Sequence, residues 1–293
     1  MGYLFLILKA VAHQSETMVV KKYGQKHQVG GMFFNAVICL FSMIFFAVTD
    51  KGGFYFPKEL WFYGIVSSLM FAGGFYYMYA ALKAGSFALT KLLSSFSGVI
   101  TIFYGIAILR ERANYLTYIS LTLVFVSVFL MNFKGTKADD TAEKKPFSLK
   151  WLIYVIIVLL ANGFIGILQK MQQLRFDNAC SNEFMIISLG GAFLALAAFG
   201  FVLERERLGY IIKHGTLYGM AAGVLNGISN FTGLLMLLYL PISLSTPLNT
   251  GAGIVLSFVI SIAIYKEKFN KVQLLSAVVG LVALILMKIS QSI

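Results

Sequence analysis

Charged residues are scarce in this chain of 293 residues. Asp, Glu, Lys and Arg make up 12% of it, about half of the roughly 25% that is usual for a soluble domain. Acidic residues are fewer than basic ones, with 12 Asp and Glu against 24 Lys and Arg. A surface of ordinary soluble type cannot be built from so few charges, so the composition excludes a soluble globular protein.

Cysteine and histidine are also rare, and the common enzyme motifs are missing. Cys39 and Cys180 are far apart and offer no disulfide or metal framework. His13, His27 and His214 are scattered, which argues against zinc. There is no phosphate-binding loop, dinucleotide fingerprint or Gly-x-Ser-x-Gly elbow. We therefore expect no cofactor, no metal and no enzymatic activity. An intramembrane enzyme acting on lipids would need clustered acids or histidines, and none is apparent.

Hydrophobic residues make up 59% of the chain and fall in long runs. A helix needs about 20 apolar residues to span a bilayer. Ten runs approach or exceed this length: 2–20, 29–49, 59–82, 86–109, 114–133, 150–173, 183–203, 213–238, 241–265 and 271–289. The sequence predicts an all-α integral membrane protein with ten transmembrane helices. Its expected surroundings are the lipid bilayer of the plasma membrane, and a monomer suffices for the fold.

A motif near the middle of the chain recurs near its end. Residues 106–114 read IAILRERAN, and residues 262–270 read IAIYKEKFN, at an offset of 156. The repeat divides the chain into a five-helix unit at 1–133, a charged linker at 134–149 and a second five-helix unit at 150–293. Because five is an odd number of crossings, the second unit is expected to be inverted, with a shared site near the membrane midplane.

Ten spans, a five-plus-five repeat and a glutamate motif after the fourth span of each half resemble the drug/metabolite transporter superfamily, EamA-type branch. The resemblance implies a transporter fold. Two features depart from the usual family pattern. A proline often stands in spans four and nine, where this chain has Ser97-Gly98 and Gly253. A Trp-Gly pair often stands in span one, where this chain has the segment from Lys9 to Glu16.

The repeated glutamates are expected to be structural. Glu111 and Glu267 are each flanked by cations and followed three residues later by Asn114 or Asn270. Asparagine is a good N-cap, and a carboxylate near a helix start meets the positive end of the helix dipole. We therefore expect these four residues to anchor the turns after spans four and nine.

Span one carries an unusual polar face. Lys9, His13 and Glu16 are spaced so that they share one side of a helix. A charge in the hydrocarbon core costs about 2.5–3.5 kcal/mol on insertion scales, so such residues usually face a cavity or a partner. We predict that all three bind substrate. Internal pairing of Glu16 with His13 or Lys9 is the alternative.

Other spans carry polar faces that point to the same cavity. Span six, the repeat partner of span one, has Asn162, Gly166, Gln169 and Gln173 on one side. The remaining candidates for substrate contact are tyrosines of span three and polar residues of spans four, eight and nine: Tyr76, Tyr79, Lys91, Asn226, Asn230 and Asn249. Tyrosines can instead be core aromatics, and intramembrane asparagines can join helices to one another.

These features favour a secondary carrier that moves a small organic metabolite by alternating access through a mildly cationic cavity. His13 and Glu16 are the candidates for proton coupling, since both can titrate near neutral pH. Two alternatives remain open at this point. One is a proton-coupled multidrug exporter for cationic compounds, and the other is a membrane scaffold or sensor that transports nothing.

The net charge of +12 does not indicate a nucleic-acid partner, because the cations lie mostly between the spans. The face that carries both termini receives Lys51, Lys58, Arg110, Arg112, Arg175 and Lys288, and most other cations lie on the opposite face. The positive-inside rule then favours termini outside the cell, whereas the family resemblance favours termini inside.

Overall fold

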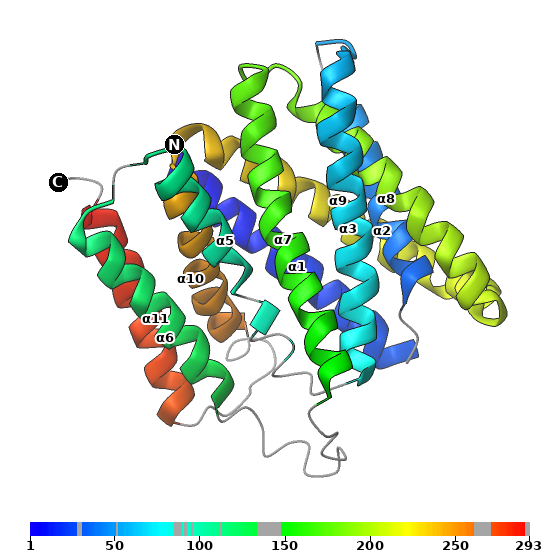
Figure 1. Ribbon diagram of the computed structural model, residues 1–293. Helices are drawn as coiled ribbons and strands as arrows, with labels where there is room; N and C mark the ends of the chain where they lie inside the picture. The colour runs from blue at the N-terminus through cyan, green and yellow to red at the C-terminus, as the bar shows by residue number, and fades with distance from the viewer. Residues whose placement is uncertain are drawn as a thin grey trace.

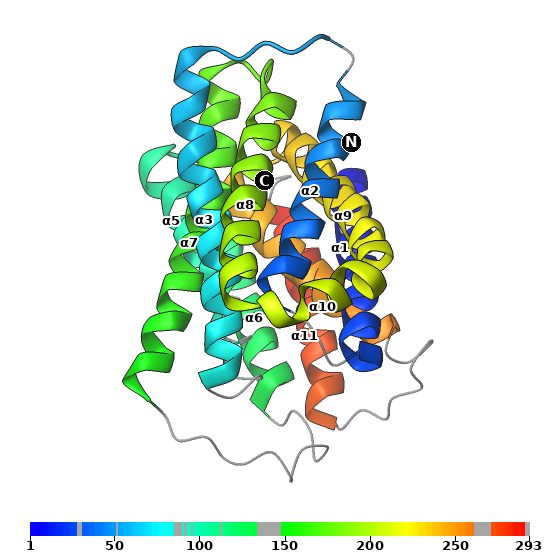
Figure 2. The ribbon, with the colours of Figure 1, turned by 90° about the vertical axis from the view of Figure 1, so that its right-hand side faces the viewer.

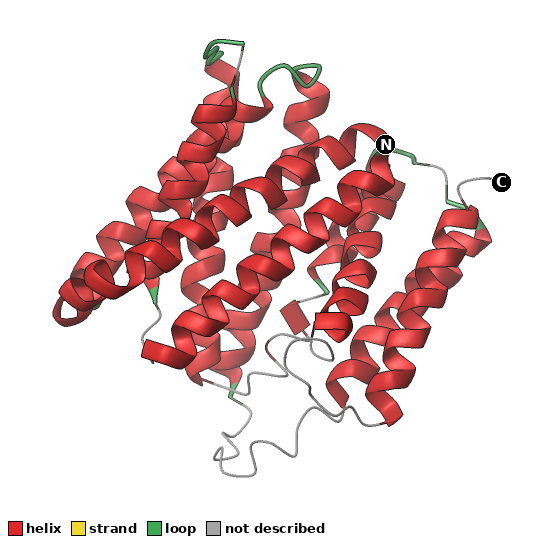
Figure 3. Cartoon of the chain, turned by 180° about the vertical axis from the view of Figure 1, so that it is seen from behind, coloured by secondary structure: helices red, strands yellow, loops and turns green. Residues whose placement is uncertain are grey.

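The computed structural model describes residues 1–27, 31–50, 52–84, 90, 93–94, 96–111, 113–133, 148–260 and 271–290. Regular structure in these residues is helical, as Figure 3 shows. The helices are α1 (Gly2–His27), α2 (Met32–Thr49), α3 (Lys58–Ala84), α5 (Ser97–Phe103), η1 (Tyr104–Ile108), α6 (Tyr115–Phe133), α7 (Leu149–Arg175), α8 (Ser181–Leu203), η2 (Arg205–Arg207), α9 (Leu208–Tyr239), α10 (Ile242–Ile260) and α11 (Lys271–Ser290). Each of the ten apolar runs overlaps one of these helices.

Several helices are long and apolar enough to cross a membrane. Among the described residues these are Met32–Thr49, Leu149–Arg175, Ser181–Leu203 and Arg205–Tyr239. Shorter apolar helices occur at Ser97–Ile108, Tyr115–Leu130 and Leu274–Met287. The described N-terminal and C-terminal helix ends lie at the same end of the bundle (Figure 1). An all-α membrane architecture is thus confirmed, and ten crossings remain a prediction.

The helices pack in a reciprocal pattern. The contact of α1 with α9 has a counterpart in α7 with α3, and that of α2 with α9 has a counterpart in α8 with α3. Likewise α1 contacts α10, and α7 contacts α5. Further contacts join α2 to α8, α6 to α11 and α10 to α11 (Figures 1 and 2). Apart from the contact of α10 with α11, these helix pairs are unchanged when α1, α2, α3, α5 and α6 are exchanged with α7, α8, α9, α10 and α11 in that order.

Two large hydrophobic clusters lie on either side of the bundle. One joins α2, α3, α7, α8 and α9 around Phe46, Phe184 and Met185, which are fully buried. The other joins α1, α5, α6, α9, α10 and α11 around Leu248 and Met287. Both clusters contain residues from each half of the chain, so neither half completes its core alone.

Hydrogen bonds between serines supplement the apolar packing of α6 on α11. The Ser127 hydroxyl donates to the Ser276 carbonyl, and the Ser276 hydroxyl donates to the Ser127 carbonyl, each at 2.8 Å. Both residues are fully buried. Small hydroxyl residues let helix backbones approach closely where no water competes.

Close approach of helices also depends on particular glycines. A Cβ on Gly223 of α9 would lie 2.7 Å from the Ile38 carbonyl oxygen of α2. Because that neighbour is backbone, it cannot move aside as a flexible side chain would. By contrast, a Cβ on Gly73 of α3 would meet no atom within 4 Å.

We predict that Gly223→Ala lowers the melting temperature of the detergent-purified protein, whereas Gly73→Ala does not. Overpacking of this kind costs about 1–3 kcal/mol, while alanine in an open helical position gains about 1 kcal/mol over glycine. Thermal unfolding followed by circular dichroism measures both. Equal melting temperatures for the two variants would contradict the close contact of α2 with α9.

Candidate functional site: a polar cavity between the two halves

A cavity of 200 Å³ lies between helices of both halves. Its walls come from α1 and α5 of the first unit and from α7, α9 and α10 of the second. The lining is rich in hydroxyl and amide groups: Ser97, Thr101, Asn162, Gln169, Asn230, Ser245, Thr246 and Asn249. Such groups offer both donors and acceptors, so the cavity suits a polar ligand rather than a lipid tail.

Lys9 is the charged residue among those that line the cavity. It lies in the second turn of α1, and its ammonium group packs against α9 at Gly233. A Cβ at Gly233 would be 2.6 Å from Lys9 Nζ, so this glycine provides the space that the lysine occupies. An ammonium held here gives the cavity a positive end for an anionic group of a ligand.

The structure brings four of the predicted site residues together in the lining: Lys9, Gln169, Asn230 and Asn249. They come from α1, α7, α9 and α10, and the two most distant lie 240 residues apart in the sequence. Gln169 is only 8% exposed. Part of each polar face predicted for spans one, six, eight and nine therefore lines one cavity.

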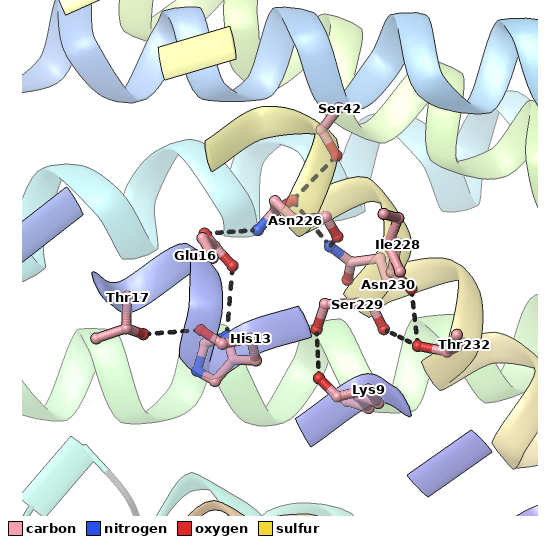
Figure 4. Close-up of polar contacts among 10 residues, drawn as sticks. All are labelled: Lys9, His13, Glu16, Thr17, Ser42, Asn226, Ile228, Ser229, Asn230 and Thr232. Carbon is pink, nitrogen blue, oxygen red and sulfur yellow. Dashed lines mark hydrogen bonds and ion pairs between the residues drawn. The ribbon is translucent and has the colours of Figure 1, made fainter. Parts of the chain in front are cut away.

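Glu16 and Asn226 lie beside this cavity rather than in its lining, and they form a hydrogen-bonded chain (Figure 4). The Asn226 amide donates to Glu16 Oε1 at 3.0 Å, and Ser42 donates to Asn226 Oδ1 at 3.0 Å. Asn230 donates to the same Asn226 oxygen at 2.9 Å. The charge of Glu16 is thus connected through Asn226 to Asn230, which faces the cavity.

His13 contacts Glu16 but is not part of the cavity wall. Its Nδ1 lies 3.4 Å from Glu16 Oε2, and its side chain is 58% exposed. The internal pairing considered as an alternative for the polar face of span one is therefore present in the structure. A proton on the histidine would turn this contact into an ion pair with the carboxylate.

The two tyrosine candidates lie outside the cavity lining. Tyr76 and Tyr79 pack against the large hydrophobic cluster of α2, α3 and α8. The Tyr76 ring lies 5.7 Å from that of Phe199 on α8. Their surroundings match core aromatics, which was the alternative for these residues. Lys91 falls outside the described residues.

The threonines of α5 and α10 are lining residues that the sequence did not single out. Thr101 donates to Thr246 Oγ1 at 2.9 Å across the interface between the halves. Thr101 follows Ser97 by one helical turn, and this spacing places the two residues on one face of the helix, which could have identified Thr101 as a lining residue. Ser97-Gly98, one of the departures from the family pattern, also lies in the lining.

Lys170 lies beside the cavity, in contact with the lining residue Leu237. Its ammonium donates to the Leu237 carbonyl in the last turn of α9 at 2.9 Å. Leu237 itself lines the cavity. Lys170 therefore satisfies a helix C-terminus beside the cavity without entering it, in agreement with its omission from the predicted site.

Glu111 has a structural role, but its partner differs from the one expected. Its carboxylate accepts the backbone N–H groups of Ile242 and Ser243, each at 2.9 Å. It therefore caps α10 in the opposite half. We had expected it to anchor the turn before α6. A π-helical turn (Tyr104–Ile108) and a left-handed Arg110, φ 54°, direct Glu111 to this position.

Asn114 is the N-cap of α6, as predicted. Its side-chain oxygen accepts the Thr117 N–H at 3.0 Å, and its amide donates to the Ser290 carbonyl at 2.8 Å. The second bond ties the start of α6 to the end of α11. Glu267 and Asn270 lie outside the described residues, so their roles remain predictions.

Apolar helices packed around an internal polar cavity define a multi-pass helical membrane protein. Comparison with known proteins supports this class. A solved crystal structure of another protein superposes with a TM-score of 0.74 over 97% of this chain and 98% of that chain. The two sequences are 12% identical, so this likeness concerns the fold alone.

Residues 1–133 match the family model of the EamA-like transporter family. The resemblance expected from the sequence is thereby confirmed over these residues. A stretch of 93 residues, 32% of this chain, is 31% identical to the UDP-galactose/UDP-N-acetylglucosamine transporter srf-3 of Caenorhabditis elegans. The match spans 24% of the length of that relative.

We predict that Glu111→Gln lowers the melting temperature and leaves ligand binding per folded molecule intact. Glutamine has a single acceptor oxygen, so α10 loses one charge-assisted bond, worth about 1.5–3 kcal/mol, as well as the charge at its N-terminus. Thermal unfolding and ligand binding on the same sample separate the two effects. The exposed Glu206→Gln serves as the control. Loss of ligand binding by a folded Glu111→Gln protein would contradict a purely structural role.

Proposed function

We propose that this protein is a membrane transporter that moves a small polar organic metabolite through the cavity between its two halves. The observation that supports this most directly is the cavity itself. Its lining contains a lysine and several amides and hydroxyls, and it comes from helices of both halves. The match of residues 1–133 to the EamA-like transporter family supports the same function. The plasma membrane is the proposed location.

We further propose that transport occurs by alternating access between two inverted repeats. The reciprocal packing of helix pairs supports this arrangement, since the contacts of α9 with α1 and α2 have counterparts in those of α3 with α7 and α8. Two units with equivalent packing can exchange conformations, so the cavity opens to one side and then to the other. Contacts such as Glu111 with the start of α10 lie across the interface that would have to rearrange.

The preferred substrate is an anionic or zwitterionic metabolite. Lys9 supplies the positive charge, while the nearest acid of α1, Glu16, is bound to Asn226 and contacts His13. A relative that is similar over part of the chain is described as a carrier of nucleotide sugars, which are anionic. A lipophilic cation would meet Lys9 without a carboxylate in the lining to balance it.

We predict that Lys9→Met weakens the binding of an anionic ligand about 10-fold to 100-fold. Loss of one charge-assisted hydrogen bond, about 1.5–3 kcal/mol, corresponds to this range. A thermal-shift screen of the purified protein against organic acids, amino acids, sugar phosphates, nucleotide sugars and cationic dyes identifies the ligand. Titration of that ligand against the variant then gives the affinity.

Lys22→Met is the matched control, because Lys22 is an exposed cation on the same helix. It should bind the ligand with wild-type affinity. Hits confined to cationic dyes and abolished by Glu16→Gln would replace this proposal with the multidrug exporter. A ligand that binds but is never taken up by proteoliposomes would favour the membrane sensor.

His13 and Glu16 are proposed to couple transport to protons. Their side chains are in contact, and Asn226 connects Glu16 to Asn230 of the cavity. Protonation of Glu16 would remove the acceptor charge that orients the Asn226 amide. The Asn230 side chain would then reorient, because its amide donates to the side-chain oxygen of Asn226.

We predict that uptake into proteoliposomes responds to a pH gradient in the wild type, and that His13→Gln and Glu16→Gln reduce or abolish this response. The response is measured as the initial rate with and without the gradient. Thr17→Val is the control, since Thr17 lies on the same helix and its hydroxyl donates to the His13 backbone carbonyl and not to either ionisable side chain among the described residues. Retention of the wild-type response by both variants would eliminate proton coupling through this pair.

A further inference from the structure

A second cavity, of 180 Å³, lies at the end of the bundle where the described chain ends lie. It is bounded by the end of α2, the last turns of α7, the start of α8 and the last turns of α9. Six of its lining residues carry side-chain oxygen atoms: Asp50, Gln173, Asn178, Ser181, Asn182 and Glu183. None of the lining residues, all from the described part of the chain, is a lysine, arginine or histidine.

Two oxygen atoms of this cavity's lining are buried without a hydrogen-bond partner. Gln173 is 2% exposed, and its amide nitrogen donates to the Leu234 carbonyl at 2.9 Å. That bond fixes the amide orientation and leaves Gln173 Oε1 unbonded. Asp50 accepts the Gly52 N–H through Oδ1 at 3.0 Å, while its Oδ2 has no hydrogen-bond partner among the described residues. A buried polar atom without a partner costs about 1–3 kcal/mol, and more when it is charged.

Glu183 adds a second carboxylate to the same cavity. It is 4% exposed, and its Oε1 accepts the Tyr55 N–H at 3.0 Å. The nearby cation Arg175 is engaged elsewhere, because its guanidinium lies 2.7 Å from Glu59 Oε2. The start of α8 contributes the equivalent of about half a positive charge, which favours ionised carboxylates but does not balance two of them.

Two carboxylates at helix starts, those of Glu111 and Glu204, have both oxygens bonded, unlike the carboxylate of Asp50. Glu111 uses both oxygens to cap α10, and Glu204 uses both to accept the N–H groups of Met32 and Phe33 at the start of α2. Those carboxylates are fully used by the fold. The free oxygens of Asp50 and Gln173 are not, so they remain available to a ligand.

We propose that this second cavity binds a hard inorganic cation, sodium or calcium, through the oxygens of Asp50, Gln173 and Glu183. Carboxylate and amide oxygens are the preferred ligands of such ions. The cavity has room for the ion together with several waters, since one water occupies about 30 Å³ of liquid. The ion would join α2, α7 and α8, and it would satisfy oxygens that otherwise stay buried without partners.

The test uses the detergent-purified full chain without any organic ligand. Thermal unfolding is measured in sodium chloride, calcium chloride and choline chloride at equal ionic strength. An ion that binds only the folded state raises the melting temperature in a saturable way. We expect a rise of several degrees with sodium or calcium over choline, and the ion that gives it identifies the occupant.

Asp50→Asn should abolish this rise, and binding of the radioactive ion should fall at least tenfold. Asp177→Asn is the matched control, because Asp177 is an exposed residue of the adjoining loop that lies outside the cavity lining. Its left-handed backbone, φ 47°, also suits asparagine. Glu183→Gln provides a second variant if Asp50→Asn fails to fold.

Equal melting temperatures in all three salts, without measurable ion binding, would overturn the proposal. So would equal losses in Asp50→Asn and Asp177→Asn. Neither result affects the central cavity, because the thermal shift caused by an organic ligand is measured separately. A protein that binds the cation but no metabolite would retain this site and lose the proposed transport function.

Discussion

The need to satisfy backbone groups away from water governs this structure more than any single packing contact. Helices satisfy their own interior, but their first N–H groups need other partners. Glu111 supplies them to α10, and Glu204 supplies them to α2. In both cases the carboxylate comes from the opposite half of the chain. At Gly31, φ 150°, a side chain would collide with Glu204. The cap of α2 by Glu204 therefore requires glycine at position 31. Helix ends thus hold the two halves in register.

The central cavity follows from this arrangement. The helices are held at their ends and pack closely through small residues. The cavity lies where the facing side chains are polar instead of apolar. Lys9 can lie within the bundle because Gly233 leaves room for it against α9. The polar lining is shared between the halves, as at Thr101 and Thr246. A ligand bound there would contact both halves and would sense any change in their relative position. This property makes the cavity suitable for the proposed transport.

Charged groups in this protein fall into two kinds according to how completely the fold uses them. Glu111 and Glu204 have both oxygens bonded to backbone N–H groups and act as structural caps. Lys9 lines the central cavity, and Asp50 at the second cavity has one oxygen without a hydrogen-bond partner among the described residues. Glu16 stands between the two kinds, with one oxygen bonded to Asn226 and the other near His13. Structural carboxylates have all their oxygens hydrogen-bonded within the protein, whereas candidate ligand contacts have polar atoms left over for a ligand.

The sequence by itself determined the helical membrane class, the positions of the apolar runs, the N-cap at Asn114 and the polar faces that carry Lys9, Gln169, Asn230 and Asn249. These properties are local, because they depend on hydrophobicity and on helical spacing within one segment. Only the tertiary structure decided that Glu111 caps α10, that Tyr76 and Tyr79 pack in the core, and that Asp50, Gln173 and Glu183 line one cavity. The physical reason is that a helix face does not reveal its partner. Which helices meet depends on the packing of the whole bundle, and residues far apart in sequence become neighbours only there.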